Sequence, residues 1–339
     1  ENLAVILRKS ISSKPFIQLR EELDTLKAQL NTLKDERDAL QKKVDELAAL
    51  PDPTPEQQAE LATAREALTG KKDEIRALEE KYAKLECPVC SNNSAHRFTP
   101  DVPMIIPEIN ADHAEIIPAQ RKRLGTKRGF IAVKSNCSIQ SYVPALSALM
   151  DFEPTEVSVC TYQAISGAGK TFETWPEMVD NVIPYIGGEE EKSEKEPMKI
   201  WGRIEGDHIE SATSPVISAQ CLRVACSDGH MAAASVKFKN KPSKEVMIER
   251  WNNFKGRAQE LNLPSAPEHY LTYCEEDNRP QTKLDRMTEN GMGVTIGRLR
   301  EDTIFDYKFV SLSHNTLRGA AGGAVLMAEL LCAEGYMDR

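Results

Sequence analysis

The sequence predicts an α+β protein in which a mixed-sheet domain follows an N-terminal helical hairpin. Three observations support this prediction. Leucines recur at helical spacing through the first 85 residues, a proline-rich break interrupts them at 51–55, and from Ser91 onward short strand-like runs alternate with helical stretches. The chain of 339 residues is long enough for two or three domains, and its apolar fraction of 40% is sufficient for a sizeable core.

The charge and the cysteines restrict the classes of function. A net charge of -9 argues against a nucleic-acid partner, which would favour a basic surface. No apolar run approaches the roughly 18 residues that a membrane span needs, so we expect no membrane partner. The eight cysteines are scattered through a long chain, which favours a reducing cytoplasmic location over a disulfide scaffold.

The N-terminal segment has the pattern of an antiparallel coiled-coil hairpin, which we place at residues 1–86. A spacing that alternates between four and three residues puts the apolar side chains on one seam of each helix. Arg37 and Lys71 break the two series, and the prolines at 51–55 cannot continue a helix. The seam residues are Leu19, Leu23, Leu26, Leu30, Leu33, Leu40, Val44 and Leu47, then Leu61, Ala64, Leu68, Ile75, Leu78, Tyr82 and Leu85.

A Cys-x-x-Cys sequence, Cys87 to Cys90, follows the hairpin. Such a pair can be half of a zinc site or a redox pair. A second pair of ligands at suitable spacing is not obvious. We therefore interpret both residues as ordinary buried thiols at a strand and expect no metal site.

The remaining chain alternates between strand and helix patterns. Strands are expected at 129–134, 235–239 and 305–310, and helices at 138–150 and 318–336. The charged run at 187–199 reads, taken alone, as the solvated face of a helix. These elements predict a mixed sheet with helices on one face.

Cys137 is a candidate nucleophile, because it lies just after the strand at 129–134 and at the start of the helix expected at 138–150. Backbone N–H groups and the helix dipole at such a junction would lower the pKa of the thiol and make it react fast with iodoacetamide. The alternative is a buried core cysteine, which is the default for any single cysteine.

Arg223 and His230 form a second constellation, seven residues apart between apolar stretches. A guanidinium group can hold a carboxylate through two parallel hydrogen bonds. An imidazole can move a proton to and from a thiolate. A structural histidine is the alternative. A third feature, residues 163–169, is rich in small residues that would let a ligand approach the backbone closely.

These pieces, in this order, resemble the aspartate-semialdehyde dehydrogenase family. The resemblance covers about three quarters of the chain, from Ser91 or shortly before it to the end. It depends on Ser135-Asn136-Cys137-Ser138, Gln163-Ala164-Ile165-Ser166-Gly167-Ala168-Gly169, Gly188-Glu189-Glu190-Glu191-Lys192, Cys221-Leu222-Arg223-Val224 with Asp228-Gly229-His230, and Ser313-His314-Asn315-Thr316 with Gly319-Ala320-Ala321-Gly322.

The resemblance implies an NADPH-dependent reduction of L-aspartyl 4-phosphate to L-aspartate 4-semialdehyde, in the biosynthesis of lysine, methionine and threonine. Cys137 would form the thioester, with His230 as general acid and base. The other roles that it implies are substrate orientation by Gln163, substrate binding by Arg223, Glu189, Lys192, Arg97 and Asn136, phosphate binding by Lys192 and Arg97 in particular, and NADP binding by Ser166, Gly167, Gly169, Asn315 and Thr316.

The resemblance also implies a homodimer or tetramer and a division of the chain. Residues 87–136 would be the remnant of a dinucleotide-binding (Rossmann) domain, 137–314 the catalytic and dimerisation domain, and 315–339 a C-terminal helix packed on the remnant. The family's glycine-rich phosphate turn has no counterpart before Gly70, where the hairpin stands instead. Two alternatives therefore stay open: a catalytically disabled dimerising scaffold, and a related malonyl-coenzyme A reductase.

Overall fold

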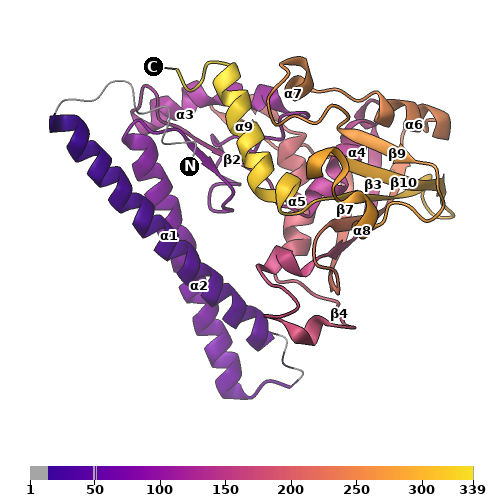
Figure 1. The fold of residues 1–339 in the computed structure, drawn as a ribbon, viewed down its shortest axis with the longest axis horizontal. Helices are drawn as coiled ribbons and strands as arrows, with labels where there is room; N and C mark the ends of the chain where they lie inside the picture. Colours follow the sequence, from indigo (N-terminus) through magenta and orange to yellow (C-terminus); the bar gives the residue numbers. More distant parts are fainter. Residues whose placement is uncertain (1–13, 49, 51, 339) are drawn as a thin grey trace. The chain divides into compact units, whose positions relative to one another are not determined.

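The computed structural model describes residues 14–48, 50 and 52–338, and it divides into two compact units with their boundary between Cys87 and Pro88 (Figure 1). Some features of the expected hairpin, namely Pro51 and the side chains of Leu19 and Leu23, lie outside the described residues. Each unit has its own secondary structure and is described separately.

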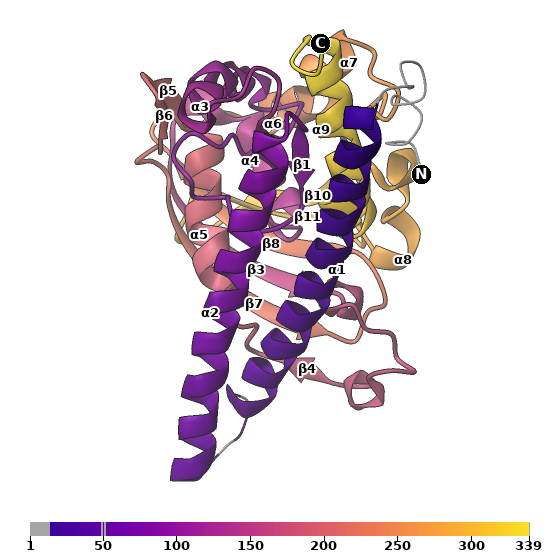
Figure 2. The same cartoon turned by 90° about the vertical axis from the view of Figure 1, so that its left-hand side faces the viewer.

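The first unit contains two long helices, α1 (Lys14–Ala48) and α2 (Pro55–Lys84), which lie side by side (Figure 2). Their direction is antiparallel, because Lys43 pairs with Glu60 at 2.7 Å and Lys71 with Glu36 at 2.8 Å. The second of these ion pairs explains why a lysine interrupts the apolar seam. Helix α2 begins with a capping box of Thr54 and Gln57, which satisfies backbone N–H groups that have no partner within the helix.

The second unit is built from short helices and eleven strands, within the described residues. The strands are β1 (Val89–Ser91), β2 (Ile131–Val133), β3 (Pro154–Gln163), β4 (Val182–Ile183), β5 (Arg203–Glu205), β6 (His208–Glu210), β7 (Val216–Val224), β8 (His230–Phe238), β9 (Leu271–Cys274), β10 (Val294–Glu301) and β11 (Tyr307–Ser313). The α-helices are α3 (Ile117–Leu124), α4 (Val143–Ser147), α5 (Glu189–Ile200), α6 (Lys244–Asn252), α7 (Arg257–Glu260), α8 (Thr282–Asp285) and α9 (Gly322–Ala333).

Seven strands form the main sheet in the order β4-β7-β3-β8-β11-β10-β9. The pairs β3–β7 and β9–β10 are parallel, and the other neighbours are antiparallel, so the sheet is mixed as the sequence predicts. Side chains along β3 alternate between buried and more exposed positions. Such alternation is typical of a sheet that packs on one face only.

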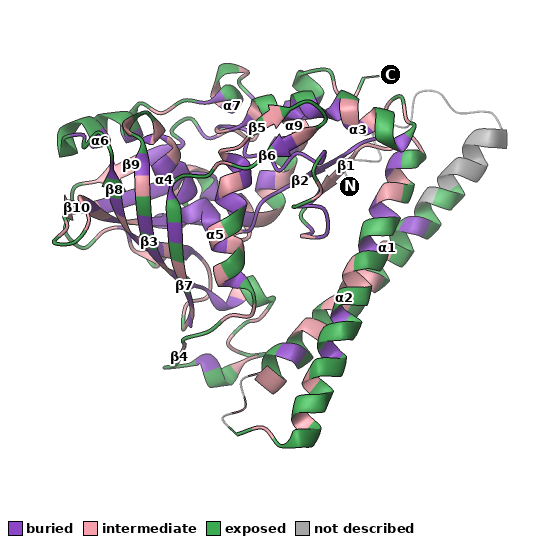
Figure 3. Ribbon diagram, turned by 180° about the vertical axis from the view of Figure 1, so that it is seen from behind, coloured by how far each residue is buried: buried purple, intermediate pink, exposed green. Residues whose placement is uncertain are grey.

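The packed face of the sheet is covered by helices, and its other face is open over β3, β7 and β8 (Figure 3). Helix α5 packs against β7, and α6 against β9. Trp251 of α6 is fully buried, stacks on Tyr273 of β9 and contacts Phe309 of β11. Its indole N–H donates to the carbonyl of Ala145 at 2.8 Å.

A smaller parallel sheet, β1 with β2, packs with α9 in a separate apolar cluster. Phe130, Ile117, Leu326 and Leu330 are buried there. Cys90 lies in β1 against this cluster, whereas Cys87 lies before the strand. The C-terminal helix is therefore joined to the beginning of this unit by apolar packing.

Two helical predictions differ from the structure. The helix expected at 138–150 is not continuous: two short 3-10 helices, η4 (Ile139–Ser141) and η5 (Met150–Phe152), flank the five-residue α4. Pro144 explains this, since it fits only the first turn of a helix. The helix expected at 318–336 is also shorter, because a π-helical turn, η9 (Leu317–Ala321), precedes α9.

The charged run at 187–199 is the largest correction. It does form a helix, α5, but the prediction of a solvated face is wrong. Glu189, Ser193, Glu196 and Lys199 are all buried, and they recur at i, i+4, i+7 and i+10 along one side. A buried charge is tolerated only when it is paired or hydrogen-bonded, so this face must meet polar partners.

Trp251→Ala should destabilise the second unit by about 3–5 kcal/mol, because it leaves a large cavity and an unpaired carbonyl beneath the sheet. The measurement is urea unfolding followed by circular dichroism. Val246→Ala, on the more exposed side of α6, is the matched control and should change the free energy of unfolding by less than about 0.5 kcal/mol. Equal effects of the two substitutions would contradict the packing described here.

Candidate active site

Four strand ends meet at one edge of the main sheet and carry the candidate residues. Strands β3 and β7 run parallel, and their last paired residues are Gln163 and Arg223. Strand β8 runs the opposite way and begins with His230, opposite Ser313 at the end of β11. The register of the sheet therefore brings together three residues that are far apart in the sequence.

Cys137 reaches the same place from the loop after β2. Its Sγ lies 3.5 Å from Nε2 of His230, and the residue is half-buried. The loop is held by Asn136, whose side-chain oxygen accepts from the backbone N–H and the hydroxyl of Ser138, both at 2.7 Å. Such local hydrogen bonds favour a turn over a helix. Cys137 is thus presented by a turn rather than by a regular helix.

His230 is fully buried and held in one tautomer. The backbone N–H of Ala164 donates to Nδ1 at 3.1 Å, so the proton of the neutral ring is on Nε2 and points to Cys137. Burial and the charge of neighbouring Arg223 together lower the pKa of His230 to about 3. The imidazole is therefore neutral at physiological pH and presents an N–H donor to the sulfur.

Arg223 is buried beside this ring and donates from Nη1 to the carbonyl of Ala164 at 2.8 Å. A Cβ on Gly167 would stand 2.9 Å from both Nη1 of Arg223 and the ring of His230. Only glycine leaves room for this close packing. Arg223, His230 and the backbone of 164–167 therefore form one rigid wall.

Glu189, at the start of α5, is a buried carboxylate with three donors. Asn136 Nδ2 donates to both of its oxygens at 3.0 Å, Gln163 Nε2 donates at 3.3 Å and Lys192 Nζ at 2.6 Å. Burial alone would raise the pKa of this carboxyl, but Lys192 and the hydrogen bonds outweigh it and lower the pKa to about 2. Glu189 is therefore ionised at neutral pH.

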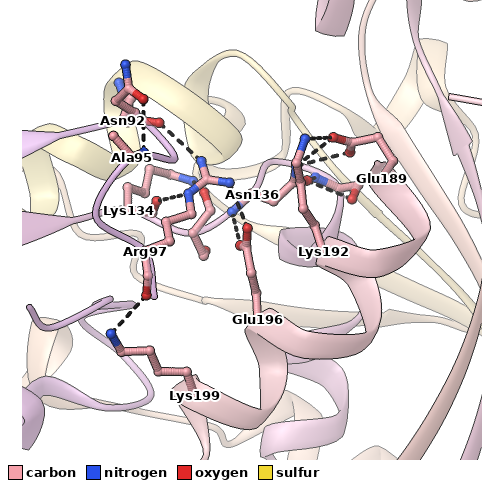
Figure 4. A network of polar contacts seen from close by, with 12 residues as sticks. Asn92, Ala95, Arg97, Lys134, Asn136, Glu189, Lys192, Glu196 and Lys199 are labelled. Atoms are coloured by element: carbon pink, nitrogen blue, oxygen red, sulfur yellow. Dashed lines mark hydrogen bonds and ion pairs between the residues drawn. The ribbon is translucent and has the colours of Figure 1, made fainter. Parts of the chain in front are cut away.

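A second buried carboxylate, Glu196, contacts Arg97 and the loop that carries Cys137 (Figure 4). Its Oε1 accepts from Arg97 Nη1 at 2.8 Å, and its Oε2 from the backbone N–H of Asn136 at 2.6 Å. Arg97 also donates to the carbonyls of Lys134 and Asn92. The two cations, Arg97 and Lys192, are thus each paired with a glutamate of α5.

The expected low pKa of the Cys137 thiol is wrong for the protein alone. Burial raises the pKa of this thiol and the carboxylate of Glu189 raises it further, whereas Lys134, Arg97 and Arg223 lower it. Because the residue stands in a turn, no regular helix begins at the sulfur to stabilise a thiolate. Fast alkylation of the free protein is therefore not expected.

The residues predicted to bind a cofactor lie at the same edge. Ser166, Gly167 and Gly169 belong to the 3-10 turn η6 (Ile165–Ala168) and its end, and Asn315 follows β11. Asn315 Nδ2 donates to the hydroxyl of Ser166 at 2.9 Å, and its oxygen accepts from the backbone N–H of Gly229. Thr316 contacts the ring of His314.

These residues fit the nicotinamide end of a dinucleotide better than its pyrophosphate. Gly167 packs against the ring of His230, whose Nε2 faces Cys137, and the neighbouring small residues Ser166 and Gly169 would let a flat ring approach closely. In the second unit as described, neither β1 nor β2 leads into a glycine-rich turn that opens a helix, which is the usual pyrophosphate cradle.

Sequence reasoning missed two members of the site, Glu196 and Lys134. Glu196 had a detectable signal: it lies seven residues after Glu189 and four after Lys192, so all three share one helix face. Lys134 had no signal, because a lysine at the end of a strand is usually solvent-exposed. Within the described ranges no cluster of three or more potential ligands is arranged to hold a metal ion.

Comparison with known proteins gives a consistent family. Residues 146–318 match the model of the semialdehyde dehydrogenase dimerisation domain. The chain is 41% identical to the aspartate-semialdehyde dehydrogenase of Aspergillus fumigatus, over 77% of this chain and 74% of the relative. It is 42% identical to the enzyme of that name from Archaeoglobus fulgidus, over 77% and 75%. The malonyl CoA reductase (NADP) of Metallosphaera sedula is 40% identical, over 77% and 74%.

Solved structures give the same result. Aspartate semialdehyde dehydrogenase with NADP from Candida albicans superimposes with a TM-score of 0.70 at 34% identity, over 78% of this chain and 76% of that one. Aspartate semialdehyde dehydrogenase II from Vibrio cholerae, at 23% identity and a TM-score of 0.60, shares the fold over 76% and 78%. The helices of the described chain include none that is long and apolar enough to cross a membrane.

Glu189→Gln should make Cys137 react faster with iodoacetamide at pH 7. The substitution removes the carboxylate that raises the pKa of the thiol, so more thiolate is present, and a fall of one pKa unit corresponds to about tenfold in rate. The measurement is the alkylation rate of Cys137, followed by mass spectrometry. Glu191→Gln, on the exposed side of the same helix, is the control and should leave the rate unchanged. A slower rate in Glu189→Gln would refute this electrostatic assignment.

Proposed function

This chain belongs to the aspartate-semialdehyde dehydrogenase family, and on that premise we propose that Cys137 is the nucleophile of an NADP-dependent reduction of L-aspartyl 4-phosphate. The observation that carries the proposal is the 3.5 Å approach of Cys137 Sγ to His230 Nε2, at the end of the sheet where β7 carries Arg223, with Glu189 contributed by α5. The protein is an oxidoreductase by family, and its product is L-aspartate 4-semialdehyde.

The thiolate of Cys137 attacks the acyl carbon of the substrate, the bond from this carbon to the phosphate oxygen breaks, phosphate leaves, and a thioester joins the substrate to Sγ. NADPH, when bound, supplies the hydride that reduces this thioester. The oxygen of the resulting hemithioacetal carries negative charge, and His230, whose Nε2 proton lies beside Sγ, would donate a hydrogen bond to this oxygen. Breaking the C–S bond then releases the aldehyde and the thiolate.

Arg223 and Glu189 recognise the amino-acid end of the substrate. The guanidinium of Arg223 pairs with the α-carboxylate, and the ionised carboxyl of Glu189 pairs with the α-ammonium group. Gln163 and Asn136 both donate to Glu189, and they orient it and the substrate next to Cys137. A site with a buried carboxylate favours a ligand that brings its own positive charge.

Lys192 and Arg97 bind the phosphate group. Both are held by glutamates of α5 in the free protein, within reach of the loop that carries Cys137. Two cations on one side of the reacting carbon stabilise the phosphate as it leaves.

NADP is the cofactor, as in the Candida albicans relative, whose structure contains it. Ser166, Gly167, Gly169, Asn315 and Thr316 would hold its nicotinamide end against Cys137. We assign the unit of β1, α3 and β2 as the remnant of a dinucleotide-binding domain, on which α9 packs, and the helices of residues 1–86 as a coiled-coil hairpin. The proposed divisions are 87–136 for the remnant, 137–314 for catalysis and dimerisation, and 315–339 for the C-terminal helix that packs on the remnant.

The open face of the main sheet is proposed as the subunit interface. The matched family domain is a dimerisation domain, so the chain is expected to form a homo-oligomer. Alternating exposed residues on β3 and β7, such as Tyr162 and Val216, leave apolar side chains on this face. We place the enzyme in the cytoplasm, because its eight cysteines are free thiols.

Two other functions make different predictions. A malonyl-coenzyme A reductase is favoured by one relative at 40% identity, but malonyl has no ammonium group to pair with Glu189. A disabled scaffold would bind subunits without turnover, for want of a pyrophosphate cradle. Measuring which substrate is reduced distinguishes the malonyl-coenzyme A reductase from the proposed function, and measuring whether any turnover occurs distinguishes the scaffold.

The proposed function predicts that Cys137→Ser abolishes aldehyde-dependent reduction of NADP and that His230→Asn lowers kcat by about 100-fold or more. Arg223→Lys keeps the charge but loses the two-pronged geometry, so it should raise KM for aspartate semialdehyde more than it lowers kcat. The assay follows NADPH formation with phosphate and aspartate semialdehyde.

Lys195→Ala, on the exposed side of α5, is the control and should keep wild-type rates. Reduction of malonyl-coenzyme A in preference to aspartyl phosphate would establish the alternative substrate. An unmodified chain that dimerises but shows no turnover with either substrate would establish the scaffold.

A further inference from the structure

Lys134 is a buried lysine close to Cys137 that the proposed mechanism does not use. It follows β2 directly, three residues before Cys137, and is 2% exposed. Its Nζ donates to the carbonyl of Gly319 at 2.6 Å and to that of Ser135 at 3.2 Å. Both partners are neutral carbonyls, and among the described residues no carboxylate lies within ion-pair distance of this ammonium group. Such a charge is costly to bury unless something near it becomes negative.

The backbone of 319–323 is shaped to keep Lys134 beside Cys137. A Cβ on Gly323 would stand 2.5 Å from Cε of Lys134, so only glycine leaves room for the lysine stem. A Cβ on Gly319 would stand 2.8 Å from Cβ of Cys137, so the same backbone packs directly on the nucleophile. One turn therefore touches the cysteine with its α-carbon and the lysine with its carbonyl.

His230 is poorly suited to be the positive partner of a thiolate. Its Nδ1 accepts the backbone N–H of Ala164, so an added proton there would face another N–H. Arg223 also packs against the ring, which makes an imidazolium still less favourable. The neutral histidine can donate a hydrogen bond to the sulfur, but protonating its ring to give a positive charge is energetically unfavourable.

The other cations near Cys137 are engaged. Arg97 is paired with Glu196 at 2.8 Å and Lys192 with Glu189 at 2.6 Å. Arg223 donates to the carbonyl of Ala164, and the substrate carboxylate proposed above would neutralise it. Lys134 thus differs from Arg97 and Lys192 in having carbonyls and no carboxylate as its hydrogen-bond partners, and from Arg223 in having no proposed contact with the substrate.

We propose that Lys134 is a positioning residue whose buried ammonium group, and not the imidazolium of His230, stabilises the thiolate of Cys137. The inference rests on Cys137 being the nucleophile of the proposed function. The charged groups that face Lys134 besides the thiolate are Arg97, Arg318 and Glu196.

The acidity of Lys134 fits this role. Burial, together with the charges of Arg97 and Arg318, lowers its pKa to about 7, although the Cys137 thiolate opposes this shift. The two groups therefore titrate as a coupled pair. A thiolate raises the pKa of Lys134 and keeps it protonated, and a protonated Lys134 lowers the pKa of the thiol. Loss of the lysine charge should move the thiol titration to higher pH.

The test is the pH profile of Cys137 alkylation in the full chain, with iodoacetamide and mass spectrometry. Lys134→Gln keeps a donor for the carbonyl of Gly319 but removes the charge, and Lys134→Arg keeps the charge. Lys199→Gln is the matched control, because Lys199 is also buried and donates only to carbonyls, those of Arg97, Thr99 and Val102. Lys199 is not among the charged groups that shift the pKa of the Cys137 thiol.

Lys134→Gln should raise the midpoint of the profile by about one pH unit or more, with at least tenfold slower alkylation at pH 7. Lys134→Arg should stay nearer to wild type, Lys199→Gln should match it, and His230→Asn should shift the midpoint less than Lys134→Gln. Thermal unfolding checks each variant, and Lys134→Met replaces Lys134→Gln if the latter does not fold.

An unchanged midpoint in the folded neutral variants would overturn the proposal. A larger shift in His230→Asn would instead assign the charge to the imidazolium. Alkylation reports on the thiol without turnover, so these outcomes are distinct from a failure of the proposed function, which Cys137→Ser would reveal as retained activity.

Discussion

The site depends on the register of four neighbouring strands. Gln163 and Arg223 are direct partners at the ends of parallel β3 and β7, and His230 begins antiparallel β8 beside them. Because side chains alternate between the two faces of a sheet, a slip of one residue would turn Arg223 away from the helix-covered face. The alternation of buried positions along β3 and β8 fixes this register, since it keeps the apolar side chains under the helices. The same strand register therefore determines both the packing of the core and the positions of the candidate site residues.

Helix α5 adds the electrostatic half of the site. Its buried side supplies two carboxylates, Glu189 and Glu196, to a loop and two cations that come from other elements. Truncating one partner of such a pair leaves an uncompensated buried charge, which typically costs several kcal/mol. In the free protein the two cations, Arg97 and Lys192, are therefore paired internally. Charged side chains that look like a solvated face in the sequence thus hold the loop at Asn136 by hydrogen bonds.

The sequence predicted the reactive groups better than their surroundings. Cys137, Arg223 and His230 were identified because each carries a chemistry and a local pattern, and the structure places them together. The prediction of a helix at 138–150 was wrong because Pro144 limits it to one short turn. The prediction of a low pKa for the Cys137 thiol depended on that helix and was wrong for the same reason. Burial of α5 could not be predicted from composition, because it is decided by what packs on the helix. Lys134 was unpredictable for the same reason: its role depends on two glycines nearly 190 residues away in the sequence.

The internal pairing of the cations also bears on which substrate the proposed enzyme accepts. In the free protein Glu189 holds Lys192 and raises the pKa of Cys137. An α-ammonium group that pairs with Glu189 can take over this carboxylate and release Lys192 to the phosphate of the same molecule. It also offsets the negative charge that opposes formation of the thiolate. A substrate without an ammonium group leaves Lys192 with Glu189 and the thiol protonated. Discrimination then arises because the phosphate of such a substrate meets a Lys192 that is still paired with Glu189, so its negative charge is buried without this cation.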